Sequence, residues 1–200
     1  MGKGRLEAFT DGVMAILITI MVLELRIPEG GGLGALRPLV PVFLTYVLSF
    51  VYLGIYWNNH HHMFQLVDRI DGKILWANLH LLFWLSLIPF ATGWMGESHF
   101  ESLPSAIYGI PLLMAGLAWT ILESRIISLQ GPGSALAAAR GGGGKEWSSI
   151  AGYSLAIPLA FVDPRISHAL YVFVALLWLV PDKRVEAHID RDLSRRRSTG

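Results

Sequence analysis

Six apolar stretches, separated by glycine, proline and charged residues, recur along the chain. A helix that crosses a membrane needs about 20 mostly apolar residues, and 200 residues leave room for several such helices with short connections. Hydrophobic residues make up 53% of the sequence and charged residues only 16%, which is below the roughly 25% usual for soluble domains. The sequence therefore predicts an all-α membrane protein with several spanning helices.

The glycine, proline and charged residues between the apolar stretches give approximate bounds for six transmembrane helices. These helices are expected at residues 7–27, 38–62, 74–96, 102–127, 146–163 and 165–181, within one transmembrane domain at 1–182. Residues 183–200 are polar and basic, and they are expected to form a cytoplasmic tail. The glycine-rich segment between the fourth and fifth helices is interpreted as a linker.

Lysine and arginine are distributed unevenly over the expected connections. With six spans both termini lie on one side of the membrane, and that side holds 13 of the 16 lysine and arginine residues. Only Arg26, Arg37 and Arg165 fall on the other side. Cytoplasmic connections carry an excess of these residues, so both termini are expected in the cytoplasm.

The first helix carries charge at both ends of a short apolar centre. Bulky apolar side chains form a stripe along it, because Ile16, Ile20 and Leu23 are spaced i, i+4, i+7 and share one face. Thr19 lies beside this stripe. Two interpretations fit the pattern: a helix that lines an aqueous pore, where stacked apolar layers obstruct ions, and a helix that is buried among other helices.

Three short motifs occur in order along the chain: RLEAFTDGVMAI from Arg5, YWNNHHHMF from Tyr56 and LSLIPFATGWMGE from Leu85. Together they resemble the transmembrane protein 175 family of potassium channels. The segment RLEAFTDGVMAI, which begins at Arg5, resembles the family's R-x-x-x-F-S-D signature in the first helix. The segment YWNNHHHMF is similar to the W-x-x-H-H-x-x-F pattern at the end of the second helix, and LSLIPFATGWMGE is similar to the L-x-P-F-x-T-x-x-x-G segment of the third. The motifs occur in the family's order and, with the apolar stretches, they cover most of the chain.

The resemblance implies a potassium-selective cation channel, a homotetramer of six-helix subunits whose first helices line a central pore. It implies that Ile16, Ile20 and Leu23 form a hydrophobic constriction and that Thr19 contributes to selectivity. The TVGYG filter of ordinary potassium channels is absent from the sequence. The expected location is a bacterial plasma membrane, with potassium ions and membrane lipids as partners and no nucleic acid.

The resemblance also implies a network of motif residues at the cytoplasmic end of the first helix. Its expected members are Arg5, Phe9, Thr10 and Asp11, together with His60 or His61. Threonine replaces the signature serine at position 10 and keeps the hydroxyl group that caps a helix start. A third histidine follows the pair at a position that is frequently basic in the family, so the sequence does not decide which histidine joins the network.

Other functional classes lack the residues that they need. The chain has no cysteine, and one helix cannot aim three successive histidines at one ion because they point about 100° apart, so no metal and no cofactor are expected. An intramembrane enzyme needs a nucleophile beside a general base, and a proton-coupled transporter needs acidic residues or histidine near mid-span. The transporter and the intramembrane enzyme remain as alternatives to the channel. The protein is expected not to be an enzyme.

Overall fold

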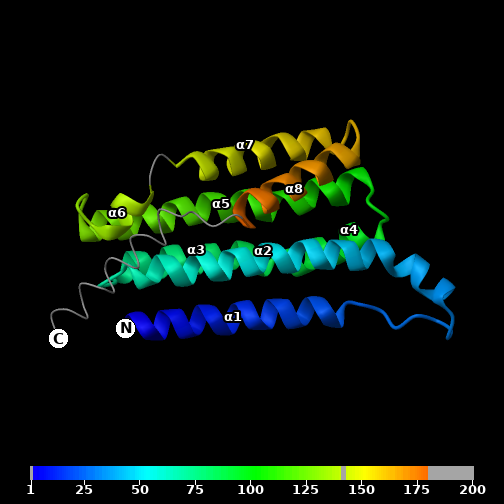
Figure 1. Cartoon of the computed structure of the whole chain (residues 1–200), viewed down its shortest axis with the longest axis horizontal. Helices are drawn as coiled ribbons and strands as arrows, with labels where there is room; N and C mark the ends of the chain where they lie inside the picture. Colours follow the sequence, from blue (N-terminus) through cyan, green and yellow to red (C-terminus); the bar gives the residue numbers. More distant parts are fainter. Residues whose placement is uncertain (1, 141–142, 180–200) are drawn as a thin grey trace.

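The computed structural model describes residues 2–140 and 143–179. The expected tail at 183–200 and the last residues of the sixth expected helix lie outside these ranges. The described residues form a bundle of helices that run side by side along its longest axis (Figure 1), and no strand occurs among them. The prediction of an all-α protein is confirmed.

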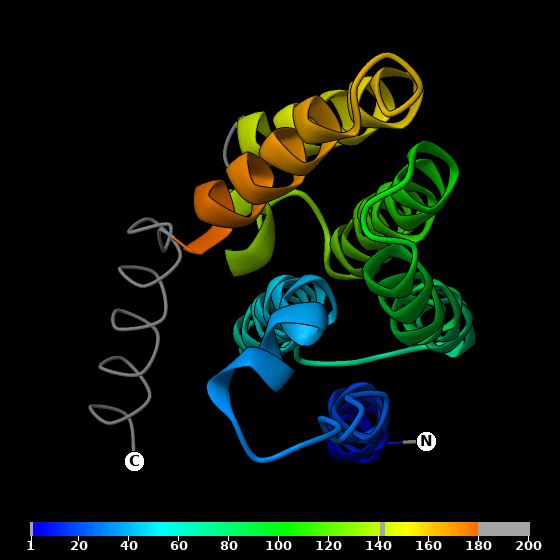
Figure 2. The ribbon, with the colours of Figure 1, turned by 90° about the vertical axis from the view of Figure 1, so that its right-hand side faces the viewer.

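The first helix, α1 (Lys3–Leu23), begins and ends four residues earlier than the expected 7–27. Its buried residues recur every three or four positions, which keeps one face of the helix against the bundle. These residues are Leu6, Thr10, Met14, Leu17 and Met21. Figure 2, which views the bundle along its length, shows α1 at its edge, where it packs against α2, α3 and α4.

The second helix, α2 (Val40–Gln65), follows directly on the short 3-10 helix η1 (Leu33–Leu39). Pro41 lies in its first turn, where the missing amide hydrogen costs no helical hydrogen bond and the fixed φ suits a helix start. His60 and His61 lie in the last turns of α2, at the end of the bundle that also holds the start of α1 (Figure 1).

The third expected span, at 74–96, is divided into two helices, α3 (Gly72–Ser86) and α4 (Ile88–Glu97). Asp71 caps α3, because its carboxylate accepts a hydrogen bond from the Ile74 amide at 2.9 Å. Pro89 has no amide hydrogen to continue the helical hydrogen bonds, and the break falls just before it. The apolar pattern runs on across this junction, which is why it predicts one helix.

The fourth helix of the expected set is α5 (Ser102–Gln130), which packs against α3, α4, α7 and α8. It ends at Gly131, whose φ of 92° lies in the left-handed region that favours glycine. The segment interpreted above as a linker contains a short helix, α6 (Ala135–Arg140). An ion pair of 3.1 Å joins Arg140 of this helix to buried Glu123 of α5.

The last two helices, α7 (Gly144–Leu159) and α8 (Pro164–Leu179), form a hairpin on the side of the bundle away from α1 (Figures 1 and 2). Each has 16 residues, a length of about 24 Å at 1.5 Å per residue. Segments long and apolar enough to cross a membrane are Lys3–Leu23, Leu33–Gln65, Gly72–Glu97 and Ser102–Gln130. The broken third segment is thus one candidate span, and α8 is a shorter apolar helix.

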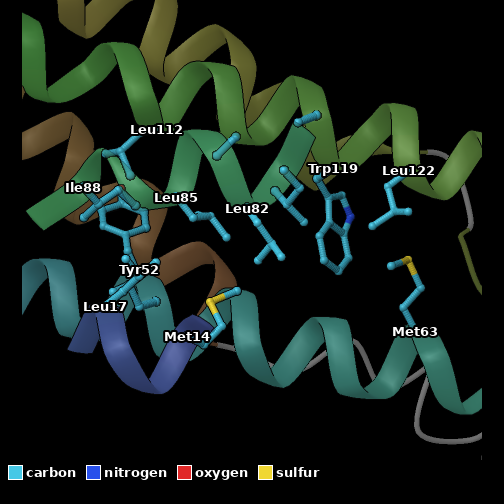
Figure 3. Close-up of a cluster of buried hydrophobic side chains, with 14 of the residues drawn as sticks. Met14, Leu17, Tyr52, Met63, Leu82, Leu85, Ile88, Leu112, Trp119 and Leu122 are labelled. Carbon is cyan, nitrogen blue, oxygen red and sulfur yellow. The ribbon is translucent and has the colours of Figure 1, made fainter. Parts of the chain in front are cut away.

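Side chains from several helices meet in one hydrophobic core (Figure 3). Met14 and Leu17 of α1 point toward the central helices, where Tyr52, Leu85 and Leu112 are fully or almost fully buried. This core holds the inner face of α1 and leaves its outer face free.

Close packing between α2 and α4 depends on a glycine. A Cβ atom at Gly96 would lie 2.8 Å from the Cα atom of Val42 and 2.7 Å from Oγ1 of Thr45. The first of these neighbours is backbone, which cannot move without shifting α2. Small residues allow helices to approach in this way.

We expect Gly96→Ala to destabilise the protein by about 1–3 kcal/mol, the usual cost of overpacking. The measurement is the midpoint of thermal unfolding of the detergent-solubilised protein. Gly93→Ala is the matched control, because no neighbouring atom lies within 4 Å of a Cβ atom at Gly93 of the same helix. Equal midpoints for the two variants would contradict the explanation by close contact.

Candidate functional site

The outer face of α1 carries the four residues that the sequence associates with a pore. In the single chain Ile16 is 57% exposed, Ile20 is 40% exposed and Leu23 is 81% exposed. Thr19 is exposed as well. All four point away from the buried face of the helix, so that this apolar stripe has no cover within the described part of the chain.

The Thr19 hydroxyl group has a defined orientation. Its Oγ1 atom donates a hydrogen bond to the carbonyl oxygen of Ile16 at 2.9 Å, one turn earlier in α1. Because the proton is held by the helix, the hydroxyl oxygen keeps its lone pairs for another group. Thr19 therefore presents an uncharged acceptor on the outer face of the helix.

A buried hydrogen-bond network joins α1, α2 and α3. The amide nitrogen of Asn78 donates to Oγ1 of Thr10 at 2.9 Å, and its amide oxygen lies 2.9 Å from Nε2 of His60. Since that oxygen can only accept, Nε2 of His60 carries the proton. The three side chains are at most 2% exposed. Their hydrogen bonds therefore pair buried polar groups that water does not reach.

A second set of contacts surrounds Asp11. The indole nitrogen of Trp57 donates to the Asp11 carboxylate at 2.9 Å, and the Trp57 ring stacks on the His61 ring at an angle of 18° between their planes. Nε2 of His61 lies 2.9 Å from the side-chain nitrogen of Gln65. The indole thus connects the carboxylate of α1 to the end of α2.

The structure therefore brings four of the expected network residues together and leaves two apart. Thr10 and His60 meet through Asn78, while Asp11 and His61 meet through Trp57. Arg5 and Phe9 are exposed, and neither side chain forms a hydrogen bond or ion pair with another residue among those described. No ion pair joins Arg5 to Asp11 within the described chain.

Two connecting residues are absent from the network that the sequence predicts. Asn78 interrupts an apolar stretch, and a buried amide costs free energy unless it is hydrogen-bonded, which is a signal that the sequence already carries. Trp57 is part of the matched motif but has the character of an interfacial aromatic residue. The partners of Asn78 and Trp57 depend on how the helices pack, and the sequence alone does not predict this packing.

We expect Asn78→Leu to destabilise the protein, because it leaves the Thr10 hydroxyl and the His60 ring nitrogen buried without a partner. Each such group costs about 1–3 kcal/mol. The measurement is the thermal unfolding midpoint, with Asn58→Leu as the control because Asn58 is exposed on α2. A midpoint for Asn78→Leu equal to that of the control would rule out a stabilising network.

Metal ligands do not gather in the part of the chain that the structure describes. No group of three or more histidine, aspartate or glutamate side chains is placed to hold an ion there.

Comparison with known proteins identifies the family. Residues 5–89 match the family described as endosomal/lysosomal potassium channel TMEM175. Over 186 residues the chain is 58% identical to a protein of Chryseobacterium sp. (strain P1-3) that is named a potassium channel, and the match covers 93% of this chain and 97% of that protein. The chain belongs to the TMEM175 family. It is an integral membrane protein of an ion channel family.

Two further relatives also match most of the chain. A potassium channel of Streptomyces collinus is 32% identical over 187 residues, which cover 88% of this chain and 91% of that one. The crystal structure of a lysosomal potassium-selective channel TMEM175 homolog from Chamaesiphon minutus matches with a TM-score of 0.77. It is 26% identical and covers 88% of this chain and 96% of that chain.

Proposed function

We propose that four copies of this chain form a potassium-selective cation channel whose pore is lined by α1. Conduction is passive, and each subunit crosses the membrane six times. The choice of ion is supported by the relatives, because the Chryseobacterium and Streptomyces proteins are named potassium channels and the Chamaesiphon homolog is described as potassium-selective.

The uncovered apolar stripe of α1 is the observation that carries this proposal. Ile16, Ile20 and Leu23 are all at least 40% exposed in the single chain. Charged residues flank the short apolar centre of α1, with Asp11 inside the helix and Glu24 directly after its last residue. A helix of that kind suits a site where other helices surround it and its ends meet water. Copies of α1 that meet on one axis would cover the stripe and stack it in apolar layers, which obstruct ions by dewetting.

A second face of α1 supports contact with another helix. Gly4, Ala8, Gly12 and Ala15 follow one another at intervals of four, four and three residues, so they share a face beside the apolar stripe. In the single chain nothing lies within 4 Å of a Cβ atom at Gly4 or Gly12, so the subunit itself does not require glycine there. Small residues in such a row allow a neighbouring helix to come close.

Thr19 is the proposed selectivity residue. A ring of four Thr19 hydroxyl oxygens would offer uncharged acceptors to a partly dehydrated cation, because each hydroxyl proton is donated to the Ile16 carbonyl group. Hydroxyl oxygens are weak ligands that can assist dehydration without trapping the ion.

Arg5 and Phe9 are proposed to act between subunits at the inner end of the pore helix. Phe9 lies seven residues before Ile16 and therefore on the same side of α1, and it is 50% exposed. Thr10, Asp11, His60 and His61 are proposed to hold α1 in register within one subunit through the contacts described above.

In this proposal each subunit crosses a bacterial plasma membrane six times, and both of its termini lie on the cytoplasmic side. The broken pair α3 and α4 serves as the third span, and α7 and α8 serve as the fifth and sixth. The excess of lysine and arginine on one side supports this orientation.

The test is cation flux into liposomes that contain the purified protein. We expect potassium uptake that exceeds sodium uptake, does not saturate with ion concentration as a carrier does, and needs no proton gradient. Chemical cross-linking of the same preparation is expected to end at a tetramer. Potassium uptake that depends on a proton gradient would favour a transporter. The absence of both potassium and sodium uptake would contradict any ion pathway.

A further inference from the structure

A cavity of about 40 Å³ lies among α2, α5, α7 and α8, in the half of the bundle that holds the start of α1. On this measure one water molecule needs roughly 10–15 Å³, so the cavity has room for a small organic molecule. Five of the ten described residues that line it are aromatic. The aromatic lining residues are Tyr52, Tyr56, Trp119, Tyr153 and Trp178.

The aromatic rings are held in fixed orientations. The Trp178 indole donates to Oγ of Ser149 at 2.7 Å, and the Ser149 hydroxyl in turn donates to the carbonyl oxygen of Lys145 at 2.8 Å. Tyr52 donates to the carbonyl oxygen of Tyr171. Figure 3 shows the Trp119 ring extending from α5 toward α2. The cavity therefore exists before any ligand enters it.

Two side chains of the lining supply oxygen acceptors. Glu146 lies in the first turn of α7 and supplies a carboxylate, which forms no hydrogen bond or ion pair with another residue in the described ranges. The side-chain nitrogen of Asn59 donates to the carbonyl oxygen of Ile55 at 2.8 Å, so the Asn59 amide oxygen stays available as an acceptor. Among the described residues, no lysine or arginine lines the cavity.

The ammonium group of Lys145 already lies over one of these rings, that of Trp178. Nζ of Lys145 lies 5.8 Å from the centroid of the Trp178 ring, within the range of about 6 Å at which a cation is attracted to an aromatic face. This contact indicates the charge that the lining favours.

We propose that this cavity binds a small organic ammonium ion, of the size of methylammonium to tetramethylammonium. Aromatic faces and a carboxylate attract such an ion, because its methyl groups are weakly hydrated and fit apolar walls. A potassium ion is less suited, because the few oxygen atoms of the lining cannot replace its water shell. The site lies apart from the proposed pore helix, because the described lining residues come from α2, α5, α7 and α8.

The experiment measures tetramethylammonium binding to the full-length protein by saturation-transfer NMR. The protein is solubilised in a maltoside detergent, because detergents with ammonium head groups would compete, and sodium chloride keeps the ionic strength constant. We expect saturable binding that Glu146→Gln weakens about tenfold. Trp119→Leu is expected to weaken binding by a similar factor through loss of a ring face.

Matched controls separate the cavity from the surface and from the proposed pore. Glu29→Gln removes an exposed carboxylate and Trp76→Leu removes an exposed indole, and both are expected to bind as the original chain does. Thr19→Val, which alters the proposed pore, is also expected to bind normally. Size-exclusion profiles of each variant are recorded to check that it is folded.

Three results would overturn the proposal: no saturable binding, equal weakening by Glu146→Gln and Glu29→Gln, or displacement by potassium at concentrations similar to those of tetramethylammonium. Loss of binding in Thr19→Val alone would instead place the ion in the pore. Failure of ion flux with retained tetramethylammonium binding would count against the channel and leave this cavity site standing.

Discussion

Replacing Ile16 with asparagine is expected to raise the basal potassium conductance of the reconstituted protein about tenfold, which corresponds to a barrier lower by about 1.4 kcal/mol. Ile16 is 57% exposed on the uncovered stripe of α1, and in the proposed pore four copies would form one apolar ring. Such a ring obstructs ions because water withdraws from a narrow apolar passage. An amide side chain of similar length would keep the passage wet without adding charge.

The measurement for Ile16→Asn is single-channel and macroscopic current in planar bilayers, normalised to the amount of tetramer. Ile121→Asn is the matched control, because Ile121 is 43% exposed on α5 and lies outside the proposed pore. We expect the control to conduct as the original chain does. Equal currents for Ile16→Asn and the original chain would remove Ile16 from the constriction, and an increase in both variants would point to a general loosening of the bundle.

Much of the architecture follows from the sequence because lipid imposes simple rules on it. Apolar length and the breaks between apolar stretches predict an all-α membrane protein, and the structure and the family confirm this. The helix ends are less predictable. The helix α1 ends at Leu23 rather than at residue 27. The expected third helix breaks just before Pro89. The sequence does not predict this break, because proline in the first turn of a helix and proline within a helix give the same sequence pattern.

The connections of the candidate site were the least predictable part. The motif residues indicate that a network exists near the start of α1, but only the packing of α1, α2 and α3 shows that Asn78 joins Thr10 to His60. The same packing separates the roles of the two histidines, because neighbouring helical residues point about 100° apart. His60 is buried against α3, while His61 stacks on Trp57 at the surface.

Replacing Thr19 with valine is expected to lower the preference for potassium over sodium about fivefold, equivalent to about 1 kcal/mol for the loss of a hydrogen-bonding group. Valine keeps the shape of threonine and removes only the hydroxyl oxygen, which the bond to the Ile16 carbonyl group leaves as a free acceptor on the outer face of α1. The measurement is the reversal potential with potassium on one side of the bilayer and sodium on the other.

A second substitution at the same position tests the chemistry rather than the size. Thr19→Ser restores the hydroxyl group without the methyl group, so it is expected to recover most of the selectivity that Thr19→Val loses. If both variants lose selectivity equally, the methyl group and the packing of α1 matter more than the oxygen. If neither changes the reversal potential, the ions are not selected at Thr19, and a filter must be sought at another level of α1.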